Sequence, residues 1–467
     1  MADIPSTRPA LSASYDVIIV GAGPAGATAA YYLAKGMGGQ AGKRVALLEK
    51  AVFPRDKYCG DAWCAPALDI LEDMGVLQKL EAEGLVRDTT AGGFVSPSGE
   101  SYANVDSGRR LPGARCYAIK RIICDERIAR RAAEAGAELI EDAPVVNAEL
   151  GRDGMWTVRC EGDRSFRAKI LIAADGATSR LARNLGIVTA PASGVAGRRY
   201  VRGGTHNFKS GGVLFYPTYI LPGYVAIFRH YNDDLDLGSY VIPGGVVRNN
   251  GLLEVYDQKI SNDPFIRRAL GPRAEFLEKI RVAPLRLGGE PRSTDRQFFA
   301  VGDAAGQTDP LTGEGIHTGM IGGKLAALTV HELFAKGNFS AEACQTYHQR
   351  WMDAFGSDFR LSAIGARMML RFPLFLDAAN VVAQGKGEPF MAEFGAAMTG
   401  SKPKSVFLQP NMAIPMGLEV LRQIVLRKIL RTQPAGDAAY EGRATERLAR
   451  ETAFANSCLI DPTVRAG

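Results

Sequence analysis

A glycine-rich turn near the start of the chain has the pattern best suited to holding a charged ligand. Residues 15–20 are a short run rich in β-branched side chains, typical of a buried parallel strand, and lead directly into Gly21-Ala22-Gly23-Pro24-Ala25-Gly26. Residues 27–35 then favour a helix, and the apolar run 44–48 ends on Glu49. The helix N-terminus suits a pyrophosphate, and Glu49 is placed to accept hydrogen bonds from a ribose. The full pattern therefore predicts a dinucleotide site rather than a glycine-rich turn without a ligand.

Two further acidic motifs follow strand-like segments later in the chain. The apolar segment 168–174 leads into Asp175-Gly176, and segment 297–301 leads into Gly302-Asp303. A carboxylate can accept two hydroxyl groups at once, and a neighbouring glycine lets the backbone approach a ligand closely. Taken alone, Asp303 would equally suit a helix N-cap. Beyond it, Gly313-Glu314-Gly315-Ile316 precedes a helix and offers N–H donors to an anionic group.

In the order and spacing of these motifs, the chain resembles the flavoprotein superfamily of aromatic hydroxylases, and within it the geranylgeranyl reductase family, over about residues 16–335. The resemblance implies bound FAD, with Asp303 on the ribityl hydroxyls and Arg121 near the phosphates. The donors before the helix would face the flavin N1–C2=O locus and stabilise reduced flavin. The predicted cofactor-binding residues are Gly21, Gly23, Ala25, Gly26, Glu49, Lys50, Cys59, Gly60, Asp61, Arg121, Asp175, Gly176, Gly302, Asp303, Gly313, Gly315 and Ile316.

The loop 53–61 resembles the family's Pro-x-x-x-x-Cys-Gly loop over the isoalloxazine ring. Cys59 matches the family's cysteine, and Asp61 stands where many members have a second glycine. Two interpretations of Cys59 stay open: a thiol that tunes or gates the flavin site, or a small buried residue. Cys64 is too far along the chain for a tight redox motif, so we expect no disulfide between the two. The residues predicted to be catalytic are Cys59, Gly313, Glu314 and Gly315.

Residues 188–287 are predicted to form a substrate-binding layer, because aromatic-rich strands alternate there with turn residues. Aromatic residues at strand spacing more often belong to a core than to a ligand site. The segment 223–228 lacks the tryptophan of the family's Tyr-x-Trp-x-Phe-Pro strand and of the Trp-x-Trp-x-Ile-Pro strand of flavin halogenases. His206 and His230 have no Cys or carboxylate at metal-ligand spacing, so no metal site is predicted. The residues expected to line an apolar substrate tunnel are Tyr216, Tyr224, Phe228 and His230.

Composition sets further limits on function. The formal net charge of +6 is small for 467 residues and is spread along the chain, unlike the basic stripe of a nucleic-acid-binding protein, so we expect no nucleic acid partner. Seven cysteines in no regular framework fit a reducing, cytoplasmic location, and residues 1–14 lack the succession of a secretory signal. The apolar runs 17–34 and 210–228 are interrupted by Gly and Pro, so neither is predicted to span a membrane.

The C-terminal part of the chain, residues 341–467, is predicted to be mainly helical. Within it, residues 416–431 place charged and polar side chains largely on one face and, on the other, Leu418, Leu421, Val425 and Ile429. This basic amphipathic helix either caps the substrate domain or lies at a membrane surface, and we favour the cap. The second interpretation would give the protein a peripheral contact with a membrane.

Together these features predict an α/β fold. It comprises a Rossmann-like FAD-binding domain (14–187 and 288–340), an inserted antiparallel β-sheet substrate domain (188–287) and the helical C-terminal part. The leading hypothesis is an FAD-dependent oxidoreductase that reduces double bonds of a hydrophobic, geranylgeranyl-type isoprenoid by hydride transfer from reduced flavin. The alternatives are an FAD-dependent monooxygenase, hydroxylase or halogenase-like, and a prenyl-lipid escort without catalysis. NADPH or another donor is expected to reduce the flavin, without a second Gly-x-Gly-x-x-Gly unit in the chain to bind it.

Overall fold

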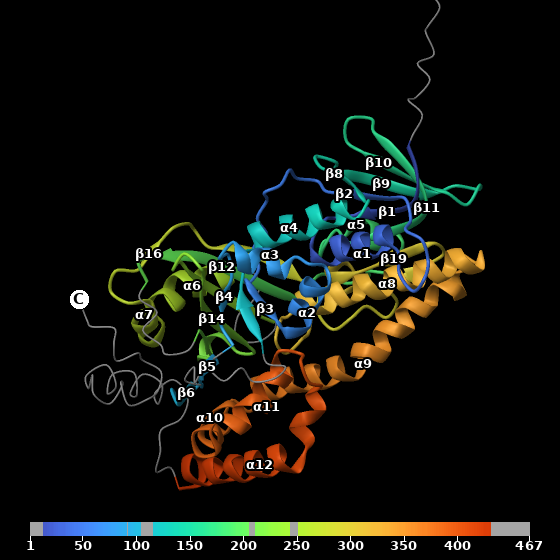
Figure 1. Cartoon of the computed structure of the whole chain (residues 1–467). Helices are drawn as coiled ribbons and strands as arrows, with labels where there is room; N and C mark the ends of the chain where they lie inside the picture. Colours follow the sequence, from blue (N-terminus) through green and yellow to red (C-terminus); the bar gives the residue numbers. More distant parts are fainter. Residues whose placement is uncertain (1–12, 91, 104–114, 205–210, 243–250, 431–467) are drawn as a thin grey trace, which may run out of the picture.

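Three parts of the molecule can be distinguished in Figure 1: a sheet flanked by helices, a second sheet, and a lobe of helices at the C-terminal end of the described chain. The computed structural model describes residues 13–90, 92–103, 115–204, 211–242 and 251–430. His206 and the end of the predicted C-terminal region, residues 431–467, lie outside them. The predicted α/β class, with a Rossmann-like domain and a helical C-terminal part, is confirmed.

The centre of the first sheet is parallel, in the order β19-β11-β1-β2-β8. Its middle strand β1 (Ala13–Val20) has neighbours on both sides and helices over its faces, which explains why Val17, Ile18 and Ile19 are all fully buried. The other strands of this sheet are β2 (Val45–Leu48), β8 (Glu138–Ile140), β9 (Val145–Leu150), β10 (Trp156–Cys160), β11 (Ser165–Ala173), β18 (Thr294–Asp295) and β19 (Phe298–Ala300).

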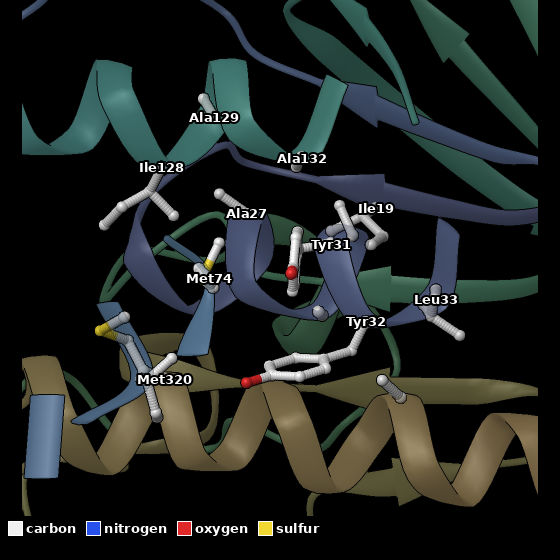
Figure 2. Close-up of a cluster of buried hydrophobic side chains, with 14 of the residues drawn as sticks. Ile19, Ala27, Tyr31, Tyr32, Leu33, Met74, Ile128, Ala129, Ala132 and Met320 are labelled. Carbon is white, nitrogen blue, oxygen red and sulfur yellow. The ribbon is translucent and has the colours of Figure 1, made fainter. Parts of the chain in front are cut away.

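Helix α1 (Pro24–Lys35) is held between two longer helices, as Figure 2 shows. Ile128, Ala129 and Ala132 of α4 (Arg121–Glu134) lie on one side, and Met320 of α8 (Ile316–Lys336) lies on the other. Helices α1 and α8 pack so closely that a Cβ added to Gly323 would lie 2.3 Å from the carbonyl oxygen of Ala25. This packing fixes the N-termini of α1 and α8 relative to each other. Shorter helices of this part are α2 (Ala65–Asp73), α3 (Leu77–Ala82) and α5 (Arg180–Asn184).

The second sheet has the order β16-β12-β15-β14-β13-β5-β6, with β17 also paired to β12. Its strands are β5 (Gly92–Val95), β6 (Ser101–Ala103), β12 (Gly194–Arg202), β13 (Gly212–Phe215), β14 (Gly223–Arg229), β15 (Leu235–Val241), β16 (Glu275–Phe276) and β17 (Arg281–Leu285). α6 (Gly251–Gln258) and α7 (Pro264–Leu270) share its hydrophobic core. Most pairs are antiparallel, as predicted, whereas β5 and β13 are parallel, with Gly92 opposite Gly212.

The predicted boundary of the substrate layer at residue 188 needs correction. Strands β5 and β6 belong to this sheet, although they come from the segment that we assigned to the FAD-binding domain. The two partners β5 and β13 are more than a hundred residues apart in the chain, so no local sequence pattern predicts that they pair. A separate small sheet, β3-β7-β4, links the two parts and comprises β3 (Ala62–Cys64), β4 (Arg87–Asp88) and β7 (Cys116–Ala118).

The C-terminal lobe begins with the long helix α9 (Ala341–Arg371), which runs from beside the first sheet toward the other helices of the lobe in Figure 1. The remaining elements are α10 (Leu374–Lys386), α11 (Glu388–Met398), the short helix η4 (Lys404–Leu408), α12 (Pro410–Ile424) and its π-helical extension η5 (Val425–Ile429). α12 packs on α10 and, through Met412 and Met416, joins the core that the lobe shares with the second sheet.

A buried carboxylate connects the lobe to the second sheet. Asp377 of α10 accepts hydrogen bonds from Oγ of Ser96 (2.6 Å) and from both N–H and Oγ of Ser98 (2.9 and 2.7 Å). It also pairs with Nη1 of Arg427 at 2.6 Å, and both side chains are 2% exposed. Removing one partner of such a pair leaves an uncompensated buried charge.

Replacing this carboxylate should therefore loosen the lobe. We expect Asp377→Ala to lower the free energy of unfolding by about 3–5 kcal/mol, because Arg427 would stay buried without its partner. Urea unfolding followed by tryptophan fluorescence measures the change. The matched control is Glu393→Ala, which removes the partly exposed Lys402–Glu393 pair of the same lobe and should cost about 0–1 kcal/mol. Equal effects of the two substitutions would contradict this account of the junction.

Candidate active site

The glycine-rich turn between β1 and α1 has the geometry that its sequence predicts. Gly21 has φ +103°, and an added Cβ would lie 2.3 Å from the carbonyl oxygen of Ala174. A Cβ on Gly26 would lie 2.0 Å from the carbonyl oxygen of Gly21, so helix and strand pack closely here. Gly23, by contrast, has no atom within 4 Å of such a Cβ and lines a cavity together with Ala25. The turn therefore leaves space for a ligand at the N-terminus of α1.

Glu49 lies beside this turn, at the end of β2. It is buried, and its carboxylate accepts hydrogen bonds from the backbone N–H groups of Ala22 (3.1 Å) and Ala51 (3.2 Å). Its Oε2 also lies 3.4 Å from Nη2 of Arg55. Lys50 is exposed and lines neither this cavity nor the larger one beside it. The structure therefore places the predicted ribose-binding acid at the turn and gives Lys50 no part in the cavity.

The two later acidic motifs reach the same cavity from neighbouring parallel strands. Gly176 follows β11, has φ +83° and also faces open space. Gly302 and Asp303 follow β19 and line the cavity with Gly23 and Gly176. Burial raises the pKa of the neighbouring Asp175, whose Oδ1 has no hydrogen-bond partner. Three segments far apart in the sequence thus meet at the carboxyl ends of adjacent strands, where ligands bind in open α/β sheets.

Asp303 brings a negative charge to this cavity. Although burial opposes its ionisation, the ammonium of Lys57 at 3.1 Å and a hydrogen bond from Oγ1 of Thr308 at 2.7 Å hold the pKa of Asp303 below its usual range. It is therefore an ionised acceptor at neutral pH. Arg121 also lines the cavity, and Asp125 holds its guanidinium in a bidentate pair at 2.7 and 2.8 Å. The open glycines at the N-terminus of α1 and the ionised acceptor Asp303 together fit the phosphate and hydroxyl groups of FAD.

A larger cavity of about 240 Å³ adjoins the first one. Both are lined by Cys59, Gly313, Gly315 and Ile316, so these predicted residues form a shared wall. The larger cavity is bounded by the second sheet, by Gly60 of the 53–61 loop and by α11 of the C-terminal lobe. The large apolar and aromatic side chains around it include Leu214, Tyr216, Tyr224, Phe228, Met391 and Phe394. The larger cavity therefore suits an apolar ligand that extends to the shared wall.

Three of the four predicted substrate residues, Tyr216, Tyr224 and Phe228, line this cavity. The prediction for His230 is wrong, because the strand ends at Arg229 and the alternation that points Tyr224 and Phe228 into the cavity ends with it. His230 is fully buried instead, with Nε2 3.1 Å from Oδ2 of Asp61. His230 belongs to a buried polar cluster with Asp61 and Asp236.

Asp61 is the centre of that polar cluster and lines neither cavity, which corrects its assignment as a cofactor contact. It is fully buried and accepts hydrogen bonds from the backbone N–H of Arg121 (3.0 Å), Nη1 of Arg198 (3.1 Å) and the hydroxyl of Tyr200 (2.7 Å). Its own N–H donates to Oδ2 of Asp236 at 3.2 Å. With these contacts, Asp61 ties the 53–61 loop to the second sheet rather than to a ligand.

Asp61, His230 and Asp236 are also the one group of described residues whose possible metal-ligand atoms all lie close together, within 4.8 Å. Sequence spacing missed this group because Asp61 comes from a distant loop. Two features disfavour a cation here. Arg198 already donates to Asp61, and burial, together with the charge of Asp61, raises the pKa of Asp236 well above its usual range, which favours its neutral form. We therefore assign no metal ion to the group.

Glu314 is one of two acids that line the larger cavity, and the other is Asp236. Burial raises the pKa of Glu314 to about 7, against the opposing hydrogen bond from the thiol of Cys64 to its Oε1 (3.2 Å). Its Oε2 has no hydrogen-bond partner and lies 3.6 Å from Nδ1 of His317. Burial lowers the pKa of His317 to about 4, so the imidazole is neutral at pH 7 and the contact is not an ion pair. A carboxyl group that exchanges its proton near neutral pH is suited to acid–base work.

Two tyrosines of the second sheet fix the segment that carries Glu314. The hydroxyl of Tyr224 donates to the carbonyl oxygen of Thr312 (2.6 Å), and that of Tyr240 donates to the carbonyl oxygen of Pro310 (3.0 Å). The ring of Tyr240 covers Gly313, where an added Cβ would lie 2.7 Å from it. Tyr224 therefore both lines the cavity and holds the wall that the two cavities share.

Three thiols line the larger cavity, whereas the sequence analysis singled out only Cys59. Cys64 of β3 lies directly opposite Cys116 of β7 in the small sheet. All six described cysteines are free, and no disulfide joins Cys59 and Cys64. Cys59 itself is half-buried and lines both cavities. The structure thus places Cys59 on the wall that the two cavities share, and its role as a thiol that tunes or gates the flavin site stays a prediction.

Other residues of the cavity escaped sequence reasoning. Residues 92–94 of β5 and six residues in or just after α11 lie outside the predicted substrate layer but line the larger cavity. The six are Met391, Ala392, Phe394, Gly395, Met398 and Thr399. Cys116, which is also outside that layer, and Asp236, which is inside it, line the cavity as well. Of these residues, only those of α11 could have been found from the sequence. Its Phe, Met and Ala residues are typical of a helix that is buried on more than one side.

Comparisons with known proteins agree with this geometry. A family model described as an FAD binding domain matches residues 14–200. Conditioned medium factor receptor 1 of Dictyostelium discoideum is 43% identical over 88% of this chain and 82% of its own length. Digeranylgeranylglycerophospholipid reductase 1 of Methanopyrus kandleri is 30% identical over 76% of this chain and 90% of its own length.

A solved structure shares the fold along nearly the whole chain. It is that of a geranylgeranyl bacteriochlorophyll reductase-like protein from Thermoplasma acidophilum, which is 21% identical and has a TM-score of 0.62 over 89% of this chain and 96% of that one. An FAD-binding domain, two adjoining cavities and relatives that match along most of their length lead to one assignment. The chain belongs to the geranylgeranyl reductase family of FAD-dependent oxidoreductases.

Proposed function

We propose that the protein reduces carbon–carbon double bonds of a geranylgeranyl-type isoprenoid lipid. The observation that carries this proposal is the wall formed by Cys59, Gly313 and Gly315, which belongs both to the dinucleotide cleft and to the apolar cavity. A long apolar substrate in the cavity would therefore lie against the ring end of the cofactor. The name of the Methanopyrus kandleri relative supports the same substrate class.

Reduced FAD, held at the turn around Gly23 and by Asp303, would supply a hydride to one carbon of the double bond, so that the other carbon must receive a proton. We assign the proton to Glu314, because its Oε2 has no hydrogen-bond partner and a pKa of about 7 leaves much of it protonated at neutral pH. The thiol of Cys64 donates to Oε1 and so orients the carboxyl group. Phe394 and Tyr216 on the cavity wall exclude water from the reacting carbons.

We also propose NADPH as the donor that reduces the flavin. The chain carries a single Gly-x-Gly-x-x-Gly unit, and in this account the turn at Gly21 to Gly26 holds FAD. NADPH would then bind transiently, without a dinucleotide domain of its own. The two experiments that follow use chemically reduced enzyme, so that their outcome does not depend on this donor.

The first experiment is anaerobic turnover. Purified enzyme reduced with dithionite should convert a geranylgeranyl lipid to products that are two mass units heavier for each saturated double bond, with one flavin reoxidised for each bond. Mass spectrometry measures the saturated bonds in the product, and the flavin absorbance measures the flavin that is reoxidised. Failure with substrates of every chain length would overturn the proposal. Oxygen uptake coupled to substrate would instead identify a monooxygenase, and a colourless protein that binds prenyl lipid would identify an escort.

The second experiment tests the proton donor. Because only protonated Glu314 can donate, the rate constant of flavin reoxidation by the substrate should fall as the pH rises through about 7. Glu314→Gln should lower this rate constant by about 100- to 10,000-fold and abolish its pH dependence, with flavin content unchanged. Single-turnover reoxidation of reduced flavin across the pH range measures both effects. The control Glu332→Gln changes a half-exposed acid of α8 and should leave the profile intact. A Glu314→Gln enzyme with the wild-type pH profile would exclude Glu314 as the donor.

A further inference from the structure

Helix α12 presents an apolar face to solvent. Its outer face, as we call it, consists of side chains spaced four, three, four and four residues apart, a spacing that places them on one side of a helix. Such a row differs from the single exposed apolar residues that are common on protein surfaces and marks an interaction surface. The members of the outer face and their exposed fractions are Ile414 (59%), Leu418 (64%) and Leu421 (61%) of α12, and Val425 (41%) and Ile429 (67%) of its extension η5.

The orientation of α12 is opposite to that of an ordinary capping helix. The sequence analysis favoured a cap, in which Leu418 and Leu421 would pack against the protein. The structure instead buries the side chains of Gln423 and Arg427, which the sequence placed on the polar side, and Arg427 pairs with Asp377 at 2.6 Å. This buried ion pair fixes the rotation of the helix, because turning the outer face inward would expose Arg427 and leave the Asp377 charge uncompensated.

The residues beside the outer face indicate what covers it. Arg422 and Lys428 are exposed and fall on opposite edges of this face. Glu419, the single acid of α12, pairs with Arg422 through two hydrogen bonds of 2.7 Å. An apolar row with cations at its edges matches the boundary of an anionic lipid bilayer, where apolar side chains enter the acyl region and cations stay at the headgroups.

The outer face is connected to the substrate cavity through a continuous hydrophobic core. Met412 and Met416 on the opposite side of α12 belong to the same cluster of packed side chains as Tyr216 and Met391, which line the cavity. In Figure 1, α12 lies at the outer edge of the lobe, away from the first sheet. The lobe therefore extends from the outer face to the cavity wall. Among the described residues, no helix is long and apolar enough to cross a membrane.

We propose that the outer face of α12 docks on an anionic lipid bilayer and that the C-terminal lobe takes its lipid substrate from that bilayer. The role in substrate uptake rests on the proposed function, whereas the docking itself does not. Vesicle binding can be measured without turnover, so failure of the docking and failure of the reductase activity are distinguishable.

The test is co-sedimentation of the full-length protein with vesicles of phosphatidylcholine alone or mixed with phosphatidylglycerol. We expect binding to the mixed vesicles and weaker binding to the neutral ones. Leu418→Glu/Leu421→Glu should weaken binding roughly tenfold or more, because charge replaces apolar area at the interface. The matched control, Leu253→Glu/Leu277→Glu, adds the same charges at two exposed leucines of the substrate domain and should bind like wild type.

Activity separates loss of docking from misfolding. The Leu418→Glu/Leu421→Glu enzyme should keep wild-type turnover of substrate dispersed in detergent and lose turnover of substrate embedded in vesicles. Wild-type protein that binds neither kind of vesicle would overturn the proposal, as would equal binding by the two double variants. A wild-type dimer that this variant converts to monomers, without vesicle binding, would assign the outer face to self-association and also overturn it.

Discussion

The segment before α8 depends on the buried carboxylate of Asp309. It accepts hydrogen bonds from the backbone N–H groups of Leu311 (2.7 Å) and Thr312 (3.0 Å) and from Oγ of Ser362 in α9 (2.7 Å). Lys404 of η4 lies 3.3 Å away and balances its charge. One carboxylate thus holds the turn, the long helix and the lobe together. Together with the hydroxyl groups of Tyr224 and Tyr240, it fixes the wall that separates the dinucleotide cleft from the apolar cavity.

That wall explains how one site can combine two unlike ligands. On one side, glycines and the ionised Asp303 suit a polar, charged cofactor. On the other, aromatic and aliphatic side chains suit a lipid, and burial among them raises the pKa of Glu314. The same exclusion of water that makes the cavity apolar therefore lets Glu314 hold a proton at neutral pH.

The sequence could predict the parts of this site that depend on local pattern. The turn around Gly23, the motif at Asp303 and the aromatic positions of β14 all follow from residue type and spacing. It could not predict that β5 joins the second sheet, because strand pairing over such a separation leaves no local signal. It also missed the burial of Arg427, since the acid that compensates this charge lies fifty residues away. Two ion pairs between residues far apart in the sequence explain these differences. Arg427 and Asp377 fix the orientation of α12, and Arg198 holds Asp61 away from the cavities.

The central claim is that lipid and flavin occupy adjoining parts of one site, and a titration tests it directly. Gly395 of α11 lines the apolar cavity with open space at its Cβ position, whereas Gly385 of α10 is exposed and does not line it. Adding a geranylgeranyl lipid should change the absorbance of bound FAD saturably in wild type and in Gly385→Leu, and much more weakly in Gly395→Leu. An absorbance that the lipid leaves unchanged, or that responds equally in both variants, would contradict the account.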